Sequence, residues 1–237
     1  MSFSLNKTLD LNPLAKAFKQ SSRVQIRNLF NEDSAGRIYT ALVAGTPWQV
    51  VYNEGTKVFQ RSIQEMSTLT QRRHRELAES IYSRAIKSFQ YLHFVYPNNT
   101  GAPLEEPDGH LLHDLLSFMN EEAFLENIRT ISGIKGISKA DGFATWFKRD
   151  HFLMQQADRE AGDDARLAYE LNFTKDWRPD YGGYLNFHDD DNDVLEAVMP
   201  RFNNMTLYKV GQPHAINYVS PFANGARVAI SGFFRCK

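Results

Sequence analysis

The fold is decided by the stretch LNFTKDWRPDYGGYLNF (residues 171–187), together with PRFNNMTLYKV (200–210) and QPHAINYVSPFANGARVAISGFF (212–234) that follow it. Each stretch contains a short segment rich in aromatic and β-branched residues, which are typical of strands. Pro, Gly, Asn and Asp separate these segments and favour turns. We therefore expect closely spaced strands in this part of the chain.

The strand pattern begins near Phe143 and continues to about Arg235. Apolar residues alternate with their neighbours in residues 168–173 and again in residues 227–234, as in strands that present alternate side chains to two faces. The sequence PDYGG at residues 179–183 reads as a turn, and we expect its two glycines to adopt positive φ. Short strands joined by such turns indicate a sandwich or jelly roll.

The N-terminal half has a different pattern. Val24–Ile26 reads as a short strand, and Asn31 is a good N-cap for a helix after it. A second helix is expected over about Thr68–Leu92, and a third from an N-cap at Asp108. We predict a mainly β protein with N-terminal helices, of the α+β class. Residues 1–140 would be mostly helical support and residues 141–237 the β core of one single domain (1–237).

Composition excludes several classes of partner. The chain carries 27 Lys and Arg against 28 Asp and Glu, so no excess positive charge favours nucleic acid or an anionic membrane. Its single cysteine, Cys236, cannot form an internal disulfide, which favours a reducing compartment. No apolar run is long enough for a signal peptide or a membrane span. We expect a cytoplasmic protein.

The ordered motifs of the last 95 or so residues resemble the core of the 2-oxoglutarate/iron(II)-dependent oxygenase superfamily, in its prolyl-4-hydroxylase-like branch. That family has a strand ending near a Trp, a Gly-Gly turn and a second strand. A Pro-x-Phe-Asn segment then leads to the next strand, and a His precedes an Arg on the last one. The resemblance implies a double-stranded β-helix (jelly roll) core.

The resemblance also implies a metal site, since the family holds iron with a His-x-Asp pair and a distant His that leave open positions. His214 matches the distant ligand. Counting back from Trp177 and the Gly-Gly turn, the pair falls on Gln156-Ala157-Asp158, so that Asp158 is present and the first histidine is replaced by Gln156. A neutral amide oxygen is a weaker ligand for iron(II) than imidazole.

Three alternatives are open at this point. Gln156 ligates iron weakly or leaves an extra open position; a nearby histidine, His151 or His188, substitutes for the missing one; or the chain has kept the fold and lost the chemistry. His188-Asp189-Asp190 also spells His-x-Asp. It follows the Gly-Gly strand instead of preceding it, so a solvated turn is the simpler interpretation.

Three further positions correspond to pocket residues of the family, two in its cosubstrate site and one in its substrate pocket, and two of the three depart from the common pattern. Arg227 corresponds to the basic residue that pairs with the far carboxylate of 2-oxoglutarate, a task suited to a bidentate and permanently charged guanidinium. Asn172 is placed where relatives often have a Tyr that binds the same carboxylate, and Trp146 where many have a pocket Tyr. A Trp there would narrow the pocket. The resemblance implies no catalytic side chain beyond the metal site.

The function implied by the resemblance is that of a non-haem iron(II) dioxygenase with 2-oxoglutarate as cosubstrate. Such an enzyme uses molecular oxygen to hydroxylate an unactivated C–H bond of a prolyl residue, an amino acid or another small molecule. The main alternative is an impaired or inactive binding or scaffold protein on the same fold. A third is another metal-dependent enzyme on this scaffold, which would have no need of Arg227. The sequence specifies neither the substrate nor the oligomeric state.

Overall fold

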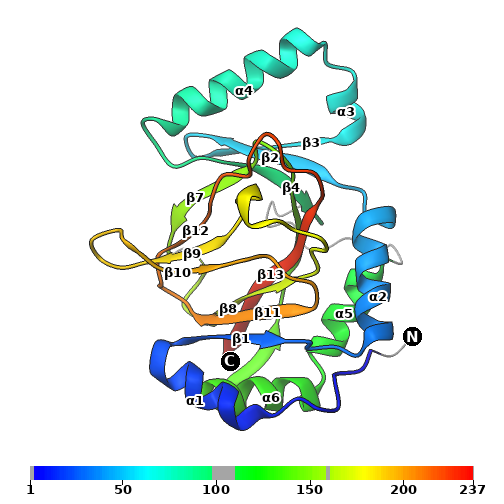
Figure 1. Cartoon of the computed structure of the whole chain (residues 1–237), viewed down its shortest axis with the longest axis vertical. Helices are drawn as coiled ribbons and strands as arrows, with labels where there is room; N and C mark the ends of the chain where they lie inside the picture. The colour runs from blue at the N-terminus through cyan, green and yellow to red at the C-terminus, as the bar shows by residue number, and fades with distance from the viewer. Residues whose placement is uncertain (1–2, 98–109, 159–160, 237) are drawn as a thin grey trace.

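The computed structural model of the protein describes residues 3–97, 110–158 and 161–236, and it combines helices at the periphery with a large curled sheet (Figure 1). The helices are α1 (Leu11–Ser21), α2 (Glu32–Thr40), the π-helical η1 (Ala41–Gly45), α3 (Ile63–Ser67), α4 (Gln71–Ala85), α5 (Leu111–Met119), α6 (Glu122–Ser132) and the 3-10 turn η2 (Pro179–Tyr181). The strands are β1 (Arg23–Arg27), β2 (Gln49–Glu54), β3 (Lys57–Ser62), β4 (Tyr91–Tyr96), β5 (Ile137–Ala140), β6 (Phe143–Phe147), β7 (Phe152–Gln156), β8 (Ala165–Asn172), β9 (Leu185–His188), β10 (Val194–Val198), β11 (Asn204–Lys209), β12 (His214–Ile216) and β13 (Arg227–Cys236).

The strands form one antiparallel network. Neighbouring strands follow the order β1-β11-β8-β13-β6-β4-β7-β12-β9-β10, while the hairpin β2–β3 is attached through β4 and β5 through β13. Strands that are distant in sequence are therefore neighbours in the sheet, as in a jelly roll, where connections cross from one sheet to the other.

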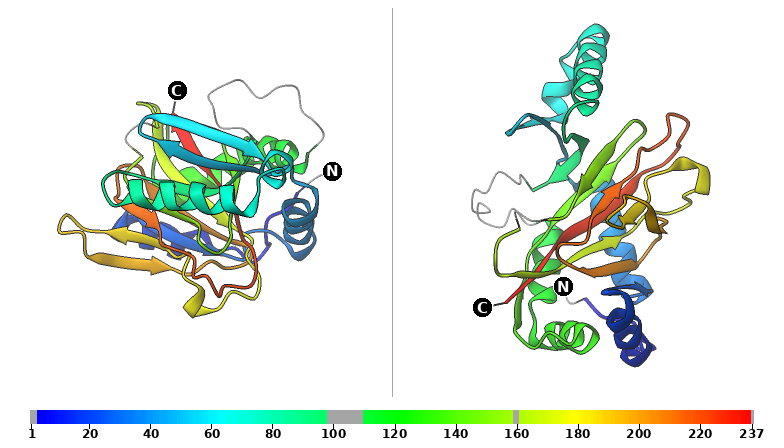
Figure 2. Two further views of the ribbon diagram at one scale, coloured as in Figure 1. Left: turned by 90° about the horizontal axis from the view of Figure 1, so that it is seen from above. Right: turned by 90° about the vertical axis from the view of Figure 1, so that its left-hand side faces the viewer.

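The sheet curls until its two ends meet. β1 and β10 are the first and last strands of the order, yet the Arg23 Nε of β1 lies 2.6 Å from a carboxylate oxygen of Glu196 on β10. Gln25 on β1 donates to the same carboxylate at 3.1 Å. The views in Figure 2 show the strands wrapped around a common interior. The predicted mainly β fold with supporting helices is confirmed.

The helices cover the outside of this sheet. Figure 1 shows α1 and α6 side by side next to β1, α2 and α5 along one flank, and α3 and α4 beyond the β2–β3 hairpin. One hydrophobic cluster fills the space between helices and sheet, with Ile38, Leu115 and Ile230 fully buried. A second and smaller cluster, which includes Phe187 and Val219, fills the inside of the roll.

Several predictions for the N-terminal half need correction. The helix expected over Thr68–Leu92 ends at Ala85, and Tyr91–Tyr96 forms strand β4, which pairs with β2, β6 and β7. The alternating aromatic residues of this segment fit the sheet better than a helix, and the tertiary pairing overrides the local 3.6-residue spacing. The β2–β3 hairpin was not predicted, so residues 1–140 supply strands as well as helical support.

The helix starts agree in part with the sequence. Asn31 caps α2 by accepting a hydrogen bond from the Ser34 backbone N–H at 2.9 Å, and Val24–Ile26 lies in β1, as predicted. Asp108, the N-cap expected for the third helix, lies outside the described residues. The described helix, α5, is capped by His110, whose Nδ1 accepts from the Leu112 N–H at 3.1 Å. None of the described helices has both the length and the hydrophobicity needed to cross a bilayer.

The Gly-Gly turn is built as the sequence predicts, with both glycines at φ 68°. A Cβ on Gly182 would lie 2.2 Å from the Tyr218 carbonyl oxygen, so no other residue fits this position. The Gly182 carbonyl accepts a 2.8 Å hydrogen bond from the Trp177 indole, and the Gly183 carbonyl accepts one from Arg227 at 2.5 Å. The turn thereby fixes the start of the last strand.

Acid should destabilise this fold through two buried histidines. Burial lowers the pKa of His151 to about 3 and that of His93 to about 4, so both are neutral in the folded protein. Unfolding restores an ordinary pKa near 6.5, so the unfolded chain binds protons first as the pH falls. We predict that the free energy of unfolding is fully retained above about pH 6.5 and decreases between pH 6.5 and pH 4.

Urea unfolding at several pH values measures this effect. Replacing His151 by Gln should reduce the slope of the unfolding free energy against pH in this window by about one proton. An unchanged slope would show that His151 is not held neutral in the folded state.

Candidate active site

The inside of the roll contains a cavity of about 410 Å³. Strands from both halves of the chain contribute to its wall, and most of the lining side chains are apolar or aromatic. Its polar lining includes Gln156, Asp158, Glu170 and His214, all from the C-terminal core. A largely apolar cavity with a few polar groups is the usual form of a site for a small ligand.

Asp158 and His214 meet in this cavity. Asp158 follows the end of β7 with φ 51°, and His214 begins β12. The antiparallel pairing of these two strands places His214 directly opposite Gln156. The Asp158 Oδ2 lies 3.6 Å from the His214 Nε2, and both side chains are nearly buried. The structure thus brings together the three residues that the sequence assigned to the metal, although their role as ligands is still a prediction.

Hydrogen bonds orient the His214 ring for such a role. Its Nδ1 lies 2.9 Å from the Gln212 carbonyl oxygen, which can only accept, so the network assigns the proton to Nδ1. Nε2 then keeps its lone pair and faces Asp158, with the Tyr208 hydroxyl 3.4 Å away. A ring nitrogen fixed through the opposite N–H is the usual arrangement of a metal-binding histidine.

The electrostatics of the cavity favour a cation beside Asp158. Burial raises the pKa of the Asp158 carboxyl, and His214 opposes this rise only in part. Burial also raises the pKa of the Tyr208 phenol well above its ordinary value, with the Asp158 and Glu170 carboxylates raising it further. A metal ion would supply the positive charge that a buried carboxylate requires.

Neither of the proposed substitute histidines reaches the cavity. His151 packs against the Phe94 ring, 5.2 Å between centroids, and its Nδ1 accepts from the Lys148 backbone N–H. His188 ends β9 directly after Phe187, whose ring lies 6.2 Å from His214, so the alternation of the strand turns His188 outward. Neither residue lines the cavity. Within the described part of the chain, no three or more His, Cys, Asp or Glu side chains form a cluster that could hold a metal.

Arg227 is fully buried and already paired. Its Nη2 lies 2.9 and 2.7 Å from the two carboxylate oxygens of Glu170, and its Nε donates to the Gly183 carbonyl at 2.5 Å. The guanidinium carbon lies 5.1 Å from the centroid of the Phe147 ring. The Glu170 side chain is only 8% exposed, and it lines the cavity. The family resemblance implies that Arg227 binds the cosubstrate, but in this structure its guanidinium is paired with the Glu170 carboxylate of the same chain.

Asn172 and Trp146 lie elsewhere than expected. Asn172 donates to Glu170 at 3.2 Å and accepts from the Thr174 N–H at 2.9 Å, so it supports the ion pair without contacting Arg227. Trp146 packs against Trp48 at 5.6 Å, under the Lys148 ammonium, and does not line the cavity. The prediction that Trp146 narrows the pocket is corrected: β6 turns its odd-numbered residues inward, Phe147 among them.

The sequence analysis missed two polar residues of the wall, Glu170 and His93. Glu170 is the one acidic residue in β8 and lies in its buried part, where a charge needs a buried partner. The sequence alone could therefore have predicted a buried partner for Glu170. His93 faces the cavity from β4 and stacks on Phe147 at 4.8 Å, which required recognising β4 as a strand.

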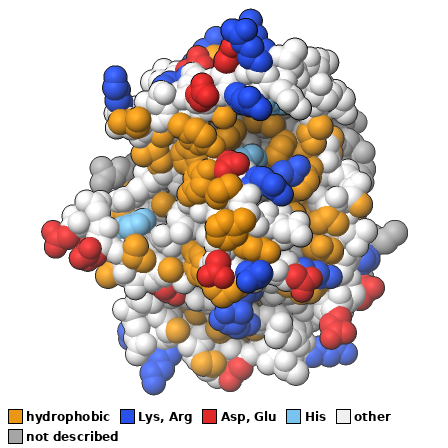
Figure 3. Space-filling model, turned by 45° about the horizontal axis from the view of Figure 1, so that its top comes forward, with side chains coloured by type: hydrophobic (Ala, Val, Ile, Leu, Met, Phe, Trp, Pro, Cys, Tyr) orange, Lys and Arg blue, Asp and Glu red, His pale blue; other side chains and the backbone are white. Residues whose placement is uncertain are grey.

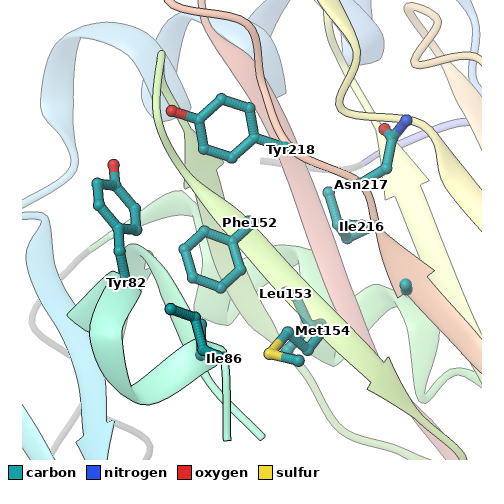
Figure 4. Close-up of a pocket in the computed structure, with 10 residues that line it drawn as sticks. Tyr82, Ile86, Phe152, Leu153, Met154, Ile216, Asn217 and Tyr218 are labelled. Atoms are coloured by element: carbon teal, nitrogen blue, oxygen red, sulfur yellow. The ribbon is translucent and has the colours of Figure 1, made fainter.

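A shallow groove lies beside the cavity on the outer surface. Figure 4 shows Tyr82 of α4 and Ile86, the residue after that helix, facing Phe152 of β7, with Tyr218 above them. Hydrophobic side chains gather on this face in the space-filling view (Figure 3), and Ile86 is 84% exposed. Among the described residues, no charged side chain lines this groove.

Comparisons with known proteins agree with this geometry. Residues 143–235 match the family model of the 2OG-Fe(II) oxygenase superfamily. This match confirms the resemblance found in the sequence: residues 143–235 are similar to the core of the 2-oxoglutarate/iron(II) oxygenases. No protein of curated function matches the chain in sequence.

Solved structures share the fold over nearly the whole chain. An oxidoreductase of the 2OG-Fe(II) oxygenase family from Burkholderia pseudomallei superposes with a TM-score of 0.61 at 12% identity, covering 98% of this chain and 93% of that one. A Pseudomonas putida prolyl-4-hydroxylase gives 0.57 at 14% identity, with 96% and 100% covered. A Trichoplax adhaerens prolyl hydroxylase, in complex with a hypoxia inducible factor peptide fragment, gives 0.58 at 13% identity, with 95% and 89% covered. These likenesses confirm the jelly-roll fold.

Breaking the buried ion pair should destabilise the protein strongly. Replacing Glu170 by Ala would leave the Arg227 charge buried without its partner, at a cost of about 3–5 kcal/mol. Glu196, which pairs with Arg23 but is 35% exposed, is a matched control whose replacement by Ala should cost at most about 1 kcal/mol. Denaturant unfolding of the two variants measures the difference. Equal costs would show that Arg227 finds another counter-charge.

Proposed function

We propose that this chain is a non-haem iron(II) oxygenase with an altered metal site, in which Asp158, His214 and the Gln156 side-chain oxygen hold the ion. The observation that carries the proposal is the distance of 3.6 Å between the Asp158 Oδ2 and the His214 Nε2, which lie beside Gln156 in the wall of one cavity. One carboxylate and one imidazole on the same side of a cavity suit iron(II), and open positions remain for other ligands.

The described residues fit the ion with one weak donor. Iron(II) would supply the activation of molecular oxygen for attack on a C–H bond. Asp158 contributes the negative charge, and His214 contributes a ring nitrogen whose direction is fixed by Gln212. The Gln156 amide oxygen is a poorer donor than an imidazole, so we expect weaker metal binding than a His at this position would give.

The cavity wall determines what can react. Its aromatic side chains, Phe147 and Tyr208 among them, keep water away from the reacting atoms and hold the substrate in position. A volume of about 410 Å³ suits a prolyl side chain, a free amino acid or another small molecule. The Trichoplax neighbour in complex with a peptide fragment supports a peptidyl substrate as one candidate.

The 2-oxoglutarate that the resemblance implies does not fit the cavity as it stands. Its far carboxylate would need Arg227, but both Glu170 oxygens already accept from the Nη2 of that guanidinium. A second carboxylate in the same buried position would meet like-charge repulsion. The proposed reaction therefore includes no step that depends on a dicarboxylate.

Metal binding tests the proposed site. Replacing Asp158 or His214 by Ala should weaken the binding of cobalt(II) or anaerobic iron(II) by about 100-fold or more. This loss should exceed the loss expected when a residue that only hydrogen-bonds to a metal ligand is removed. Replacing Gln156 by His should tighten it by about 10- to 100-fold, because an imidazole is restored. Calorimetric titration measures each constant.

The look-alike His188-Asp189-Asp190 provides the control. Replacing His188 by Ala should leave metal binding unchanged, since this residue faces away from the cavity. Loss of binding in the His188 variant, or no gain from Gln156→His, would place the metal elsewhere and contradict the proposal.

A second candidate is a binding protein without catalysis, and the occupied Arg227 and the missing first histidine favour it. Oxygen uptake separates the two functions. The metal-loaded oxygenase should consume oxygen slowly with a 2-oxo acid even without its substrate, and the Asp158→Ala variant should not. A metal-loaded parent that consumes no more oxygen than this variant, with either 2-oxoglutarate or pyruvate, would identify a binding protein.

A further inference from the structure

The ion pair between Arg227 and Glu170, of which Glu170 lines the cavity, is held by several neighbours, while the Nη1 of Arg227 has no hydrogen-bond partner among the described residues. Arg227 stacks on Phe147, directly opposite it in the pairing of β13 with β6, and its Nε donates to Gly183. Glu170 lies on β8, between β11 and β13, and also accepts from Asn172. Because β8 is hydrogen-bonded to a strand on each edge, its backbone is fixed at Glu170. The Glu170 carboxylate could leave Arg227 only if its buried side chain changed rotamer and formed another hydrogen bond.

The same pair sets the charge of the cavity. A divalent ion contributes two positive charges and Asp158 one negative charge, while Arg227 and Glu170 cancel each other. His93 is neutral at pH 7, because burial lowers its pKa to about 4. Among the residues that the structure describes, which leave out 159–160, no other Asp, Glu, Lys or Arg lines the cavity. The loaded site thus carries one net positive charge, which one carboxylate balances; without Glu170 it would carry two, the charge that a dicarboxylate balances.

We propose that Glu170 is a specificity-determining residue: a built-in carboxylate that takes the place of a dicarboxylate's far end on Arg227. The metal-loaded cavity then selects a 2-oxo acid that has a single carboxylate and an uncharged tail, and rejects 2-oxoglutarate. This inference rests on the proposed metal site for its choice of ligand. The pairing of Glu170 with Arg227 does not depend on any metal.

Titration of the metal-loaded parent with two probes tests the proposal. Pyruvate should bind to the cobalt(II) or anaerobic iron(II) protein at least 10-fold more tightly than 2-oxoglutarate. Calorimetry measures both constants, and a charge-transfer absorption band reports chelation of the 2-oxo acid by iron(II). This comparison needs no variant, so it stands even where a substitution prevents folding.

Replacing Glu170 by Gln should change the preference of the metal-loaded protein from pyruvate to 2-oxoglutarate. The Glu170→Gln variant keeps the shape and removes the charge, so 2-oxoglutarate should gain at least 10-fold in affinity and pyruvate should not. The thermal stability of the variant should also rise with added 2-oxoglutarate, since the ligand returns a counter-charge to Arg227. Glu196→Gln, which breaks the Arg23 pair outside the cavity, should leave both affinities as in the parent.

The outcomes separate this inference from the proposed function. A metal-loaded parent that prefers 2-oxoglutarate, binds both acids equally or binds neither would overturn it. If the parent protein does not bind metal, the proposed function is contradicted instead. The role of Glu170 is then tested on the metal-free protein. There, 2-oxoglutarate should stabilise Glu170→Gln against heat and leave the parent unchanged; equal stabilisation of both proteins would overturn the inference.

Discussion

A guanidinium that is wholly shielded from water must keep a negative charge next to it, and in this protein Glu170 meets that need for Arg227. The pair joins β8 to β13 and places the Glu170 carboxylate in the wall of the cavity. The Gly-Gly turn also depends on it, since the Gly183 carbonyl accepts from the same guanidinium. Fold and site therefore share one electrostatic constraint.

The proposed metal site depends on a second constraint, the register between β7 and β12. Because the two strands pair antiparallel with His214 opposite Gln156, the residue two positions further along the chain, Asp158, comes within reach of the ring. A shift of one residue would turn one of these side chains out of the cavity. The geometry for binding a cation thus comes from backbone pairing and does not require a histidine at position 156.

Much of the fold and of the candidate site could be predicted from the sequence. The C-terminal motifs follow a fixed order, and apolar and polar residues alternate along the strands. The strand pattern, the Gly-Gly turn with positive φ and the positions of Asp158 and His214 are local features or follow from the resemblance. Strand β4 and the β2–β3 hairpin were not foreseen, since sheet pairing outweighs their local spacing. Trp146 was assigned to the wrong face of its strand. The role of Glu170 was not predicted, because it depends on an ion pair with Arg227, which lies 57 positions away in the sequence.

The central claim is that a metal ion sits between Asp158 and His214 while Glu170 stays on Arg227. A crystal grown anaerobically with manganese(II) tests it directly through the anomalous scattering of the ion. The account predicts one strong peak in contact with the Asp158 carboxylate, the His214 Nε2 and the Gln156 oxygen, with both Glu170 oxygens still turned toward the guanidinium. An empty cavity, a peak at His188, or Glu170 turned toward the metal would contradict it.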